Sequence, residues 1–332
     1  MTTSAMLTHE IGRSGIQASA VGLGTWAIGG WMWGGTDEDT SIAAIRAAID
    51  AGVTLVDTAP AYGMGRSEEI VGKAIAGRRD DVVLATKCGL VWHTDRGNHF
   101  FDQDGRPVHR HLGPDSIAHE LDESLRRLRT DRIDLYITHW QDPTTPIAET
   151  MGALEDLKRA GKIRAIGASN VSPADVAAYV AAGRLDAIQE QYSMVHRDIE
   201  ADLVPLCTEH HVSIISYSSL ALGLLTGKVG PERTFEGDDL RKTDPRFTPE
   251  NRRKVAAFAA DILPVAARHD ASVAEIVIAW TVRRPGIDFS LCGARDPGQA
   301  RENARAGTIR LEAADITEID AAAARHLAGI HG

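Results

Sequence analysis

The chain has 332 residues, of which 43% are hydrophobic and 25% are charged, the composition of a globular protein rather than a disordered one. Its 36 Lys and Arg residues and 46 Asp and Glu residues give a net charge of −10, and no block of basic residues stands out. This balance argues against nucleic acid or an anionic membrane surface as a partner. The three cysteines lie far apart without a CxxC pair, which excludes a disulfide framework and a thiolate zinc site.

The N-terminal segment shows neither the basic region nor the apolar region of a signal peptide. The stretch from Ile16 to Thr36 carries no charge and is long enough to suggest a membrane span. Its six glycines instead favour a strand that runs into a glycine-rich loop. We therefore expect a soluble, cytoplasmic protein.

Short apolar runs rich in β-branched residues alternate with longer helical patterns along nearly the whole chain. Eight of these runs are predicted strands, at residues 21–26, 54–59, 82–87, 133–139, 163–169, 187–193, 212–219 and 289–294. Helical patterns lie between them, among others at 39–52, 67–77, 114–130, 146–161, 172–183 and 272–284. Eight strand–helix units over about 275 residues favour a (β/α)8 TIM barrel over an open sheet. Because no linker rich in Pro, Gly or Ser divides the sequence, residues 1–332 are predicted to form one domain.

Further elements are predicted around the barrel. A small hairpin is expected around Gly12 to Gly15 before the first unit, and a C-terminal helix at 316–327 after the eighth. Two connections are long, residues 88–113 after the third strand and 220–250 after the seventh. Both leave the carboxyl ends of strands, where barrel enzymes place their active sites, so we expect these loops to build the binding pocket.

Four reactive side chains gather at the same predicted end of the barrel. Asp57, Lys87 and His139 end three consecutive predicted strands, and Tyr62 follows Asp57 in the next loop. Any one of them alone is more often a helix cap or a surface group, whereas four together indicate a site. The Lys87 ammonium is expected to lower the pKa of the Tyr62 phenol and make it a proton donor, with Asp57 holding the ammonium and His139 orienting a carbonyl. Such a set requires a hydride, which points to a nicotinamide cofactor.

These residues lie in segments that resemble one known family over essentially the whole chain. The segments are GLGTWAIGG at 22–30, DTAPAYGMGRSEEIVGKAI at 57–75, LATKCG at 84–89, SLRRLRTDRIDLYITHWQDP at 124–143, ETMGALEDLKRAGKIRAIGASN at 149–170, SYSSLALGLLTGK at 216–228 and GARDPGQARENARA at 293–306. They resemble the aldo-keto reductases, and within them the bacterial branch near the general-stress reductases and the potassium-channel β subunits. The resemblance implies a TIM barrel with a catalytic tetrad of Tyr62, Lys87, Asp57 and His139.

The resemblance also implies a cofactor, NADP(H) with NAD(H) as the alternative, bound at the barrel mouth. It implies that Ser169, Asn170 and Gln189 hold the nicotinamide and that the ring stacks on Tyr217. It places the pyrophosphate near Gly223 and Lys228, and the adenosine near Gly293, Ala294, Arg295, Gln299 and Asn303. Further cofactor contacts are expected from Gly24, Thr25, Trp26, Asp57, Ser218 and Leu220. Substrate contacts are expected from Trp26, Trp33, Tyr62 and His139.

Three features depart from common patterns. Many family members carry a Lys where this chain has Gly293, so Arg295 is left to select NADP over NAD. Ser219 stands where the family often has Pro. The run from Gly22 to Ala27 matches a relaxed GxGxxG/A motif, but Gly29 and Gly30 stand where the helix of a Rossmann unit must begin, which disfavours that reading.

The long 88–113 connection offers several weaker signals. His93, His99, His109 and His111 gather there with Cys88, but without the spacing of a metal site, and we expect no metal. The run that starts at Asp102 opens like a calcium loop, but its twelfth position is Gly113 rather than Glu. Five tryptophans are expected near the barrel mouth, and some should line the pocket; they are Trp26, Trp31, Trp33, Trp92 and Trp140.

The sequence leaves two choices open. Aromatic walls favour an apolar group or a sugar ring in the substrate, whereas basic side chains of the 88–113 connection favour hydroxyls or an anion; these are Arg106, His109, Arg110 and His111. Glyceraldehyde-like aldehydes and aromatic aldehydes therefore both remain candidate substrates. The leading hypothesis is an NADPH-dependent, reversible reductase of small aldehydes and ketones, and the alternative is an NADP(H)-binding redox sensor that regulates a partner protein.

Overall fold

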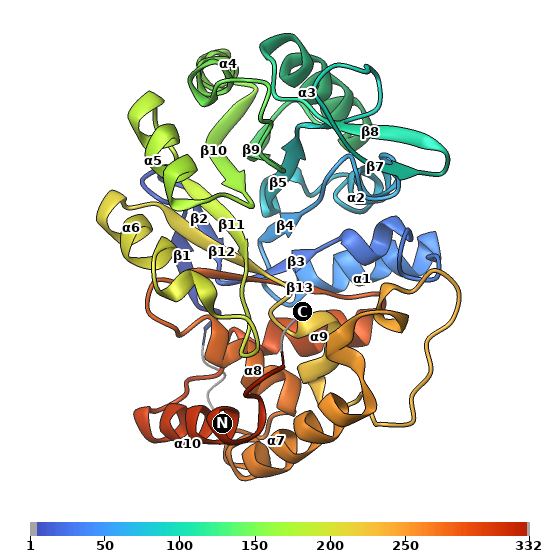
Figure 1. Cartoon of the computed structure of the whole chain (residues 1–332), viewed down its shortest axis with the longest axis vertical. Coiled ribbons are helices and arrows are strands. Elements are labelled where there is room, and N and C mark those ends of the chain that lie inside the picture. The colour runs from blue at the N-terminus through green and yellow to red at the C-terminus, as the bar shows by residue number, and fades with distance from the viewer. Residues whose placement is uncertain (1–4, 331–332) are drawn as a thin grey trace.

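The computed structural model describes residues 5–330. Eight parallel strands close into a barrel in which each strand pairs with the next along the chain (Figure 1). They are β3 (Val21–Gly24), β4 (Leu55–Asp57), β5 (Val83–Cys88), β9 (Ile133–Thr138), β10 (Ile163–Ser169), β11 (Ala187–Gln191), β12 (Ser213–Tyr217) and β13 (Phe289–Gly293). Every strand predicted from the sequence is present, and the (β/α)8 barrel is confirmed.

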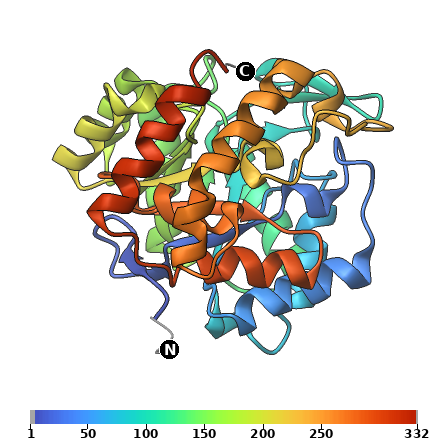
Figure 2. The same cartoon turned by 90° about the horizontal axis from the view of Figure 1, so that it is seen from below.

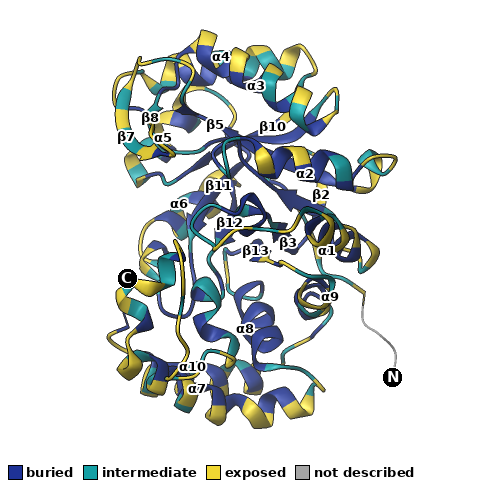
Figure 3. Ribbon diagram, turned by 90° about the vertical axis from the view of Figure 1, so that its right-hand side faces the viewer, coloured by how far each residue is buried: buried dark blue, intermediate teal, exposed yellow. Residues whose placement is uncertain are grey.

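Helices surround the barrel, with buried residues on their inner sides and exposed residues on their outer sides (Figure 3). They are α1 (Glu38–Asp50), α2 (Arg66–Ala74), α3 (Pro114–Leu128), α4 (Ile147–Arg159), α5 (Pro173–Ala182), α6 (Leu203–His210), α7 (Pro249–Arg268), α8 (Val273–Thr281), α9 (Pro297–Ala306) and α10 (Ala313–His326). Two serines show why the helices begin where they do. Ser172 and Ser272 each accept a hydrogen bond from the backbone at the third helical position, in capping boxes that start α5 and α8.

Helix α7 is an addition to the regular pattern and was not predicted from the sequence. It stands between β12 and α8, so the seventh connection carries two helices. Thr248 caps it by accepting from Asn251 N, and Pro249 occupies its first position. It runs beside the predicted C-terminal helix, α10, along the outside of the barrel (Figure 2).

The predicted N-terminal hairpin is present and closes one end of the barrel. Its strands β1 (Thr8–Glu10) and β2 (Gln17–Ser19) pair antiparallel. Ile11 and Ile16 at its turn are buried in one cluster with the inward-facing side chains of the barrel strands. The backbone N–H of Gly12 donates to the Ser213 hydroxyl at the start of β12. The hairpin therefore covers the amino end of the barrel interior.

The 88–113 connection is ordered as a small sheet rather than a plain loop. Strands β6 (Leu90–Val91), β7 (Asn98–Gln103) and β8 (Arg106–Arg110) form an antiparallel sheet in the order β6, β8, β7. The turn residues Asp104 and Gly105 have φ of 53° and 74°, which is the backbone of a type I′ hairpin turn. The resemblance to a calcium loop thus comes from a hairpin turn.

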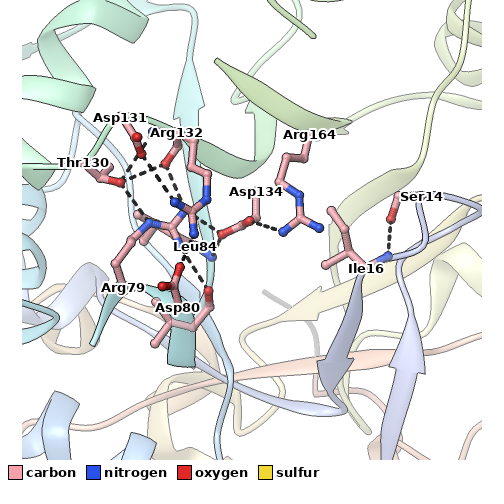
Figure 4. A network of polar contacts seen from close by, with 11 residues as sticks. Ser14, Ile16, Arg79, Asp80, Leu84, Thr130, Asp131, Arg132, Asp134 and Arg164 are labelled. Atoms are coloured by element: carbon pink, nitrogen blue, oxygen red, sulfur yellow. Dashed lines mark hydrogen bonds and ion pairs between the residues drawn. The ribbon is translucent and has the colours of Figure 1, made fainter. Parts of the chain in front are cut away.

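A network of polar contacts fixes the amino ends of β5, β9 and β10 (Figure 4). The Asp134 carboxylate accepts from Arg79 and Arg164, each at 2.7 Å, and from the backbone of Leu84 at 2.9 Å. Arg79 also donates to the Val82 and Arg132 carbonyls. Both oxygens of the buried Asp134 carboxylate are thereby engaged by the protein itself.

No helix within residues 5–330 is long and apolar enough to cross a membrane. The uncharged stretch from Ile16 to Thr36 contains β2, β3 and a short 3₁₀ helix at Trp26–Gly29. The expected strand followed by a glycine-rich loop is therefore what this segment forms.

Candidate active site

The four side chains predicted as a tetrad meet at the carboxyl end of the barrel. The fully buried Lys87 ammonium donates to Asp57 Oδ1 at 2.7 Å, to the Thr58 carbonyl at 3.0 Å and to the Tyr62 hydroxyl at 3.1 Å. These three acceptors match the three donors of a lysine, which makes its burial tolerable. The His139 ring stands edge-on to the Tyr62 ring, with centroids 5.8 Å apart.

Burial decides the protonation of this cluster. It raises the pKa of the Tyr62 phenol, against the opposing effect of Lys87. The expected lowering of this pKa is therefore wrong for the structure, because sequence reasoning counted the ammonium but not the loss of water around the phenol. Burial, together with Lys87, also holds the pKa of His139 well below its usual range. Near neutral pH the site thus holds a protonated phenol and a neutral imidazole.

A cavity of about 590 Å³ extends from the tetrad to the start of α9. Most of the predicted cofactor and substrate residues line it: Gly24, Thr25, Trp26, Trp33, Asp57, Tyr62, His139, Ser169, Asn170, Gln189, Tyr217, Ser218, Leu220, Gly223, Lys228, Gly293, Arg295, Gln299 and Asn303. Lys87 lies behind Asp57 and Tyr62 and does not reach its wall. The side chain of Ala294, another predicted adenosine contact, is buried in the core between barrel and helices and does not line the cavity.

Asn170 organises the cavity wall next to the tetrad. It follows β10 in the left-handed conformation, with φ of 56°, which asparagine tolerates better than most residues. Its amide nitrogen donates to the His139 carbonyl at 2.9 Å and to the Ser169 hydroxyl at 3.1 Å. Its amide oxygen accepts from the Tyr217 hydroxyl at 2.8 Å. The carboxyl ends of β9, β10 and β12 thus present one connected set of polar groups to the cavity.

Gln189 joins this set to the tetrad. Its side-chain nitrogen donates to Asp57 Oδ2 at 2.9 Å, while Asp57 Oδ1 receives Lys87. Both carboxylate oxygens of Asp57 therefore accept a hydrogen bond from a side chain of the protein. Sequence reasoning placed Gln189 at the site but gave no sign of this bond.

The far end of the cavity is lined by basic side chains and the first turn of α9. The Arg295 guanidinium donates to the Trp33 carbonyl at 3.2 Å, and the backbone N–H of Arg295 donates to Gln299 Oε1 at 3.0 Å. Lys228 pairs with Glu302 at 2.7 Å. Arg233 and Arg241 also line this cavity, and neither was predicted. Their isolated positions in an irregular segment gave no periodic signal by which to find them.

The 88–113 segment contributes apolar rather than basic groups to the cavity. Its lining residues are Leu90, Phe100 and Phe101, which were not predicted, and Trp140 lies beside them. The basic residues considered for substrate contact do not line the cavity; these are Arg106, His109, Arg110 and His111. Four of the five tryptophans line it and Trp92 does not. Among residues 5–330, no group of three His, Cys, Asp or Glu side chains is arranged to hold a metal ion.

Comparisons with known proteins match the chain to one family. The model of the aldo/keto reductase family matches residues 20–324. The aldo-keto reductase YhdN of Bacillus subtilis is 48% identical over 293 residues, 87% of this chain and 85% of that protein. The NADH-specific methylglyoxal reductase of Escherichia coli is 41% identical over 313 residues, 92% and 95% of the two chains.

Solved structures with the same fold extend the comparison. The glycerol dehydrogenase AKR11B4 from Gluconobacter oxydans has a TM-score of 0.86 at 38% identity, over 98% of this chain and 97% of that one. An aldo/keto reductase from Klebsiella pneumoniae in complex with NADP and acetate has a TM-score of 0.72 at 30% identity, over 96% and 95%.

Proposed function

This chain belongs to the aldo/keto reductase family of oxidoreductases, and we propose that it reduces small aldehydes and some ketones to alcohols, reversibly, with NADP(H). The observation that carries this proposal is the buried Lys87 ammonium, which bridges Asp57 at 2.7 Å and the Tyr62 hydroxyl at 3.1 Å at the cavity wall. One domain spanning the chain is part of the proposal, and the closure of the barrel from β3 to β13 supports it.

In this proposal Tyr62 is the general acid. Its raised pKa keeps the phenol protonated, so it can donate to a carbonyl oxygen in the cavity. Lys87 stabilises the phenolate that forms, and Asp57 keeps the lysine in place. The neutral His139 offers a ring N–H to the same carbonyl oxygen and orients it without adding a charge.

The cavity fits a nicotinamide dinucleotide. The bound cofactor supplies the hydride. Ser169, Asn170 and Gln189 offer hydroxyl and amide groups beside the tetrad, where a carboxamide can be recognised. About 590 Å³ lies within the range of cofactor pockets, and basic side chains line its far end, as phosphates require. The solved NADP complex of the Klebsiella relative supports NADP(H), and the name of the NADH-specific Escherichia coli relative keeps NAD(H) as the alternative.

The test is a panel of simple aldehydes and ketones, assayed for oxidation of NADPH and of NADH. We expect turnover of several aldehydes, with NADPH as the better cofactor. Cofactor binding without turnover of any carbonyl compound would instead support the redox-sensing alternative. Absence of both binding and turnover would contradict the proposal.

A further inference from the structure

A β-bulge in the β7–β8 hairpin turns two consecutive phenylalanines toward the same cavity. His99 pairs with His109, and the next pair is Phe101 with Val108, so Phe100 is an extra residue on β7. Neighbouring residues of a regular strand point to opposite faces, and a bulge breaks this alternation. Phe100 and Phe101 both line the cavity for this reason.

These two rings complete an aromatic wall beside the tetrad. Phe101 stacks on Trp31 with centroids 5.4 Å apart, and Phe100 packs against Trp140 at 5.2 Å. Trp140 directly follows His139 in the chain. On the other side, Trp26 lies 6.4 Å from the Tyr62 ring. A substrate whose carbonyl reaches Tyr62 and His139 therefore lies next to several aromatic side chains of the cavity wall.

The polar side chains of the hairpin are directed elsewhere. Arg110 lies over the Phe100 ring at 5.1 Å and donates to Asn98 at 2.6 Å. His99 pairs with Asp102 at 3.1 Å on the exposed side of β7. Because neither Arg110 nor His99 lines the cavity, the hairpin offers a substrate no hydrogen-bond partner from a side chain.

We propose that the bulged hairpin makes this a site for aldehydes that carry a planar aromatic group, with Phe100 and Phe101 as specificity-determining residues. Aromatic rings pair favourably with such a group. The hydroxyls of a glyceraldehyde-like substrate lose water against this wall and find no partner there, which disfavours them. The inference rests on the proposed carbonyl reductase function and chooses between the two substrate classes that the sequence left open.

The experiment compares kcat/KM for benzaldehyde and for glyceraldehyde, with NADPH, in the wild type and in a Phe100→Ala/Phe101→Ala double variant. The ratio of the two values cancels the concentration of folded enzyme, so it is interpretable even if the variant folds poorly. We expect the wild type to favour benzaldehyde by at least about tenfold. The double variant should lose about ten- to a hundredfold in kcat/KM for benzaldehyde and less than about threefold for glyceraldehyde.

Trp92→Ala is the matched control, because Trp92 is a half-buried aromatic residue of the same segment that does not line the cavity. Its substrate ratio should equal that of the wild type. A wild type that prefers glyceraldehyde, or a double variant that keeps the wild-type ratio, overturns the inference while leaving the reductase function in place. Failure of the wild type to turn over any aldehyde refutes the proposed function itself.

Discussion

The barrel contains an ionic cluster around a buried carboxylate at each end. The two clusters differ in whether they leave a hydrogen-bonding group available to a ligand. At the amino end, the Asp134 carboxylate accepts hydrogen bonds from two arginines and a backbone N–H. Arg79 also donates to two backbone carbonyl groups. At the carboxyl end, Lys87 and Asp57 are likewise fully engaged. There, however, Lys87 also donates to the hydroxyl of Tyr62, a residue that lines the cavity.

This difference separates a structural cluster from a reactive one. A buried carboxylate whose two oxygens are both engaged by protein donors holds strands together and leaves no acceptor for a ligand. In the tetrad, the Lys87–Asp57 ion pair instead holds a weak acid, the Tyr62 phenol, in position. This phenol can still donate its proton. Buried charge alone is therefore a poor marker of a site, whereas buried charge beside an available proton donor at a cavity is a good one.

The largest effect on activity is expected at the carboxyl end of the barrel. Replacement Tyr62→Phe removes the proton donor but keeps the ring, so turnover of a good aldehyde should fall by about a thousandfold or more. Cofactor affinity should change little, because the phenol acts in the chemical step. Steady-state kinetics and a cofactor titration measure the two. A Tyr62→Phe enzyme with wild-type turnover would remove Tyr62 from the mechanism.

At the amino end of the barrel, a substitution should change the stability of the fold rather than turnover. Asp134→Ala leaves two arginines without their partner and the Leu84 N–H without an acceptor, which should lower the free energy of unfolding by about 2–4 kcal/mol. The kcat of the folded enzyme should stay within about threefold of the wild type. Urea unfolding and kinetics on the same sample measure both.

Asp131→Ala is the control for this change, since its ion pair with Arg132 lies at the surface and should contribute less than about 0.5 kcal/mol. Equal destabilisation by the two variants would mean that the enclosed network has no special role.

A smaller effect is expected for the cofactor. Arg295→Ala should remove most of a preference for NADP(H), because a charge-assisted contact to a 2′-phosphate contributes about 1.5–3 kcal/mol, or about ten- to a hundredfold in affinity. Arg301→Ala, on an exposed part of α9 outside the cavity wall, should leave the preference unchanged. Equal wild-type affinity for NADP(H) and NAD(H) would show that Arg295, without a lysine at position 293, is insufficient.

The smallest effect is expected from pH. The pKa of Tyr62 is raised, so the phenol stays protonated until the pH exceeds its ordinary value near ~10. The pKa of His139 is lowered, so the imidazole is neutral throughout the same range. The kcat for reduction should therefore be flat from about pH 7 to about pH 9 when chemistry limits the rate. A decline centred near pH ~8 would mean that Lys87 outweighs burial and lowers the pKa of the phenol.

The repeated pattern of the barrel was readable from the sequence. All eight strands and the meeting of Asp57, Tyr62, Lys87 and His139 followed from apolar runs and from where reactive residues end them. The β7–β8 hairpin was missed although Asp104–Gly105 is a strong hairpin signal, because the run was weighed only as a calcium loop. Helix α7 was not predicted, although Thr248 followed by Pro249 is a typical signal for the start of a helix.

Other features depend on burial, which periodicity does not report. The raised pKa of Tyr62 and the burial of the Ala294 side chain both result from packing between distant segments. The direction of Phe100 depends on a single unpaired residue in one strand, and the sequence pattern alone contains no trace of it.

The place of that unpaired residue has an evolutionary consequence. Strands β7 and β8 take no part in the hydrogen-bond ladder of the barrel, so inserting or deleting one residue there shifts no barrel register. The same change within β5 would reverse the facing of the side chains beyond it and displace Lys87. Selection or directed evolution can therefore exchange the wall that meets the substrate by single-residue insertions and deletions, while the proton-donating machinery is inherited unchanged.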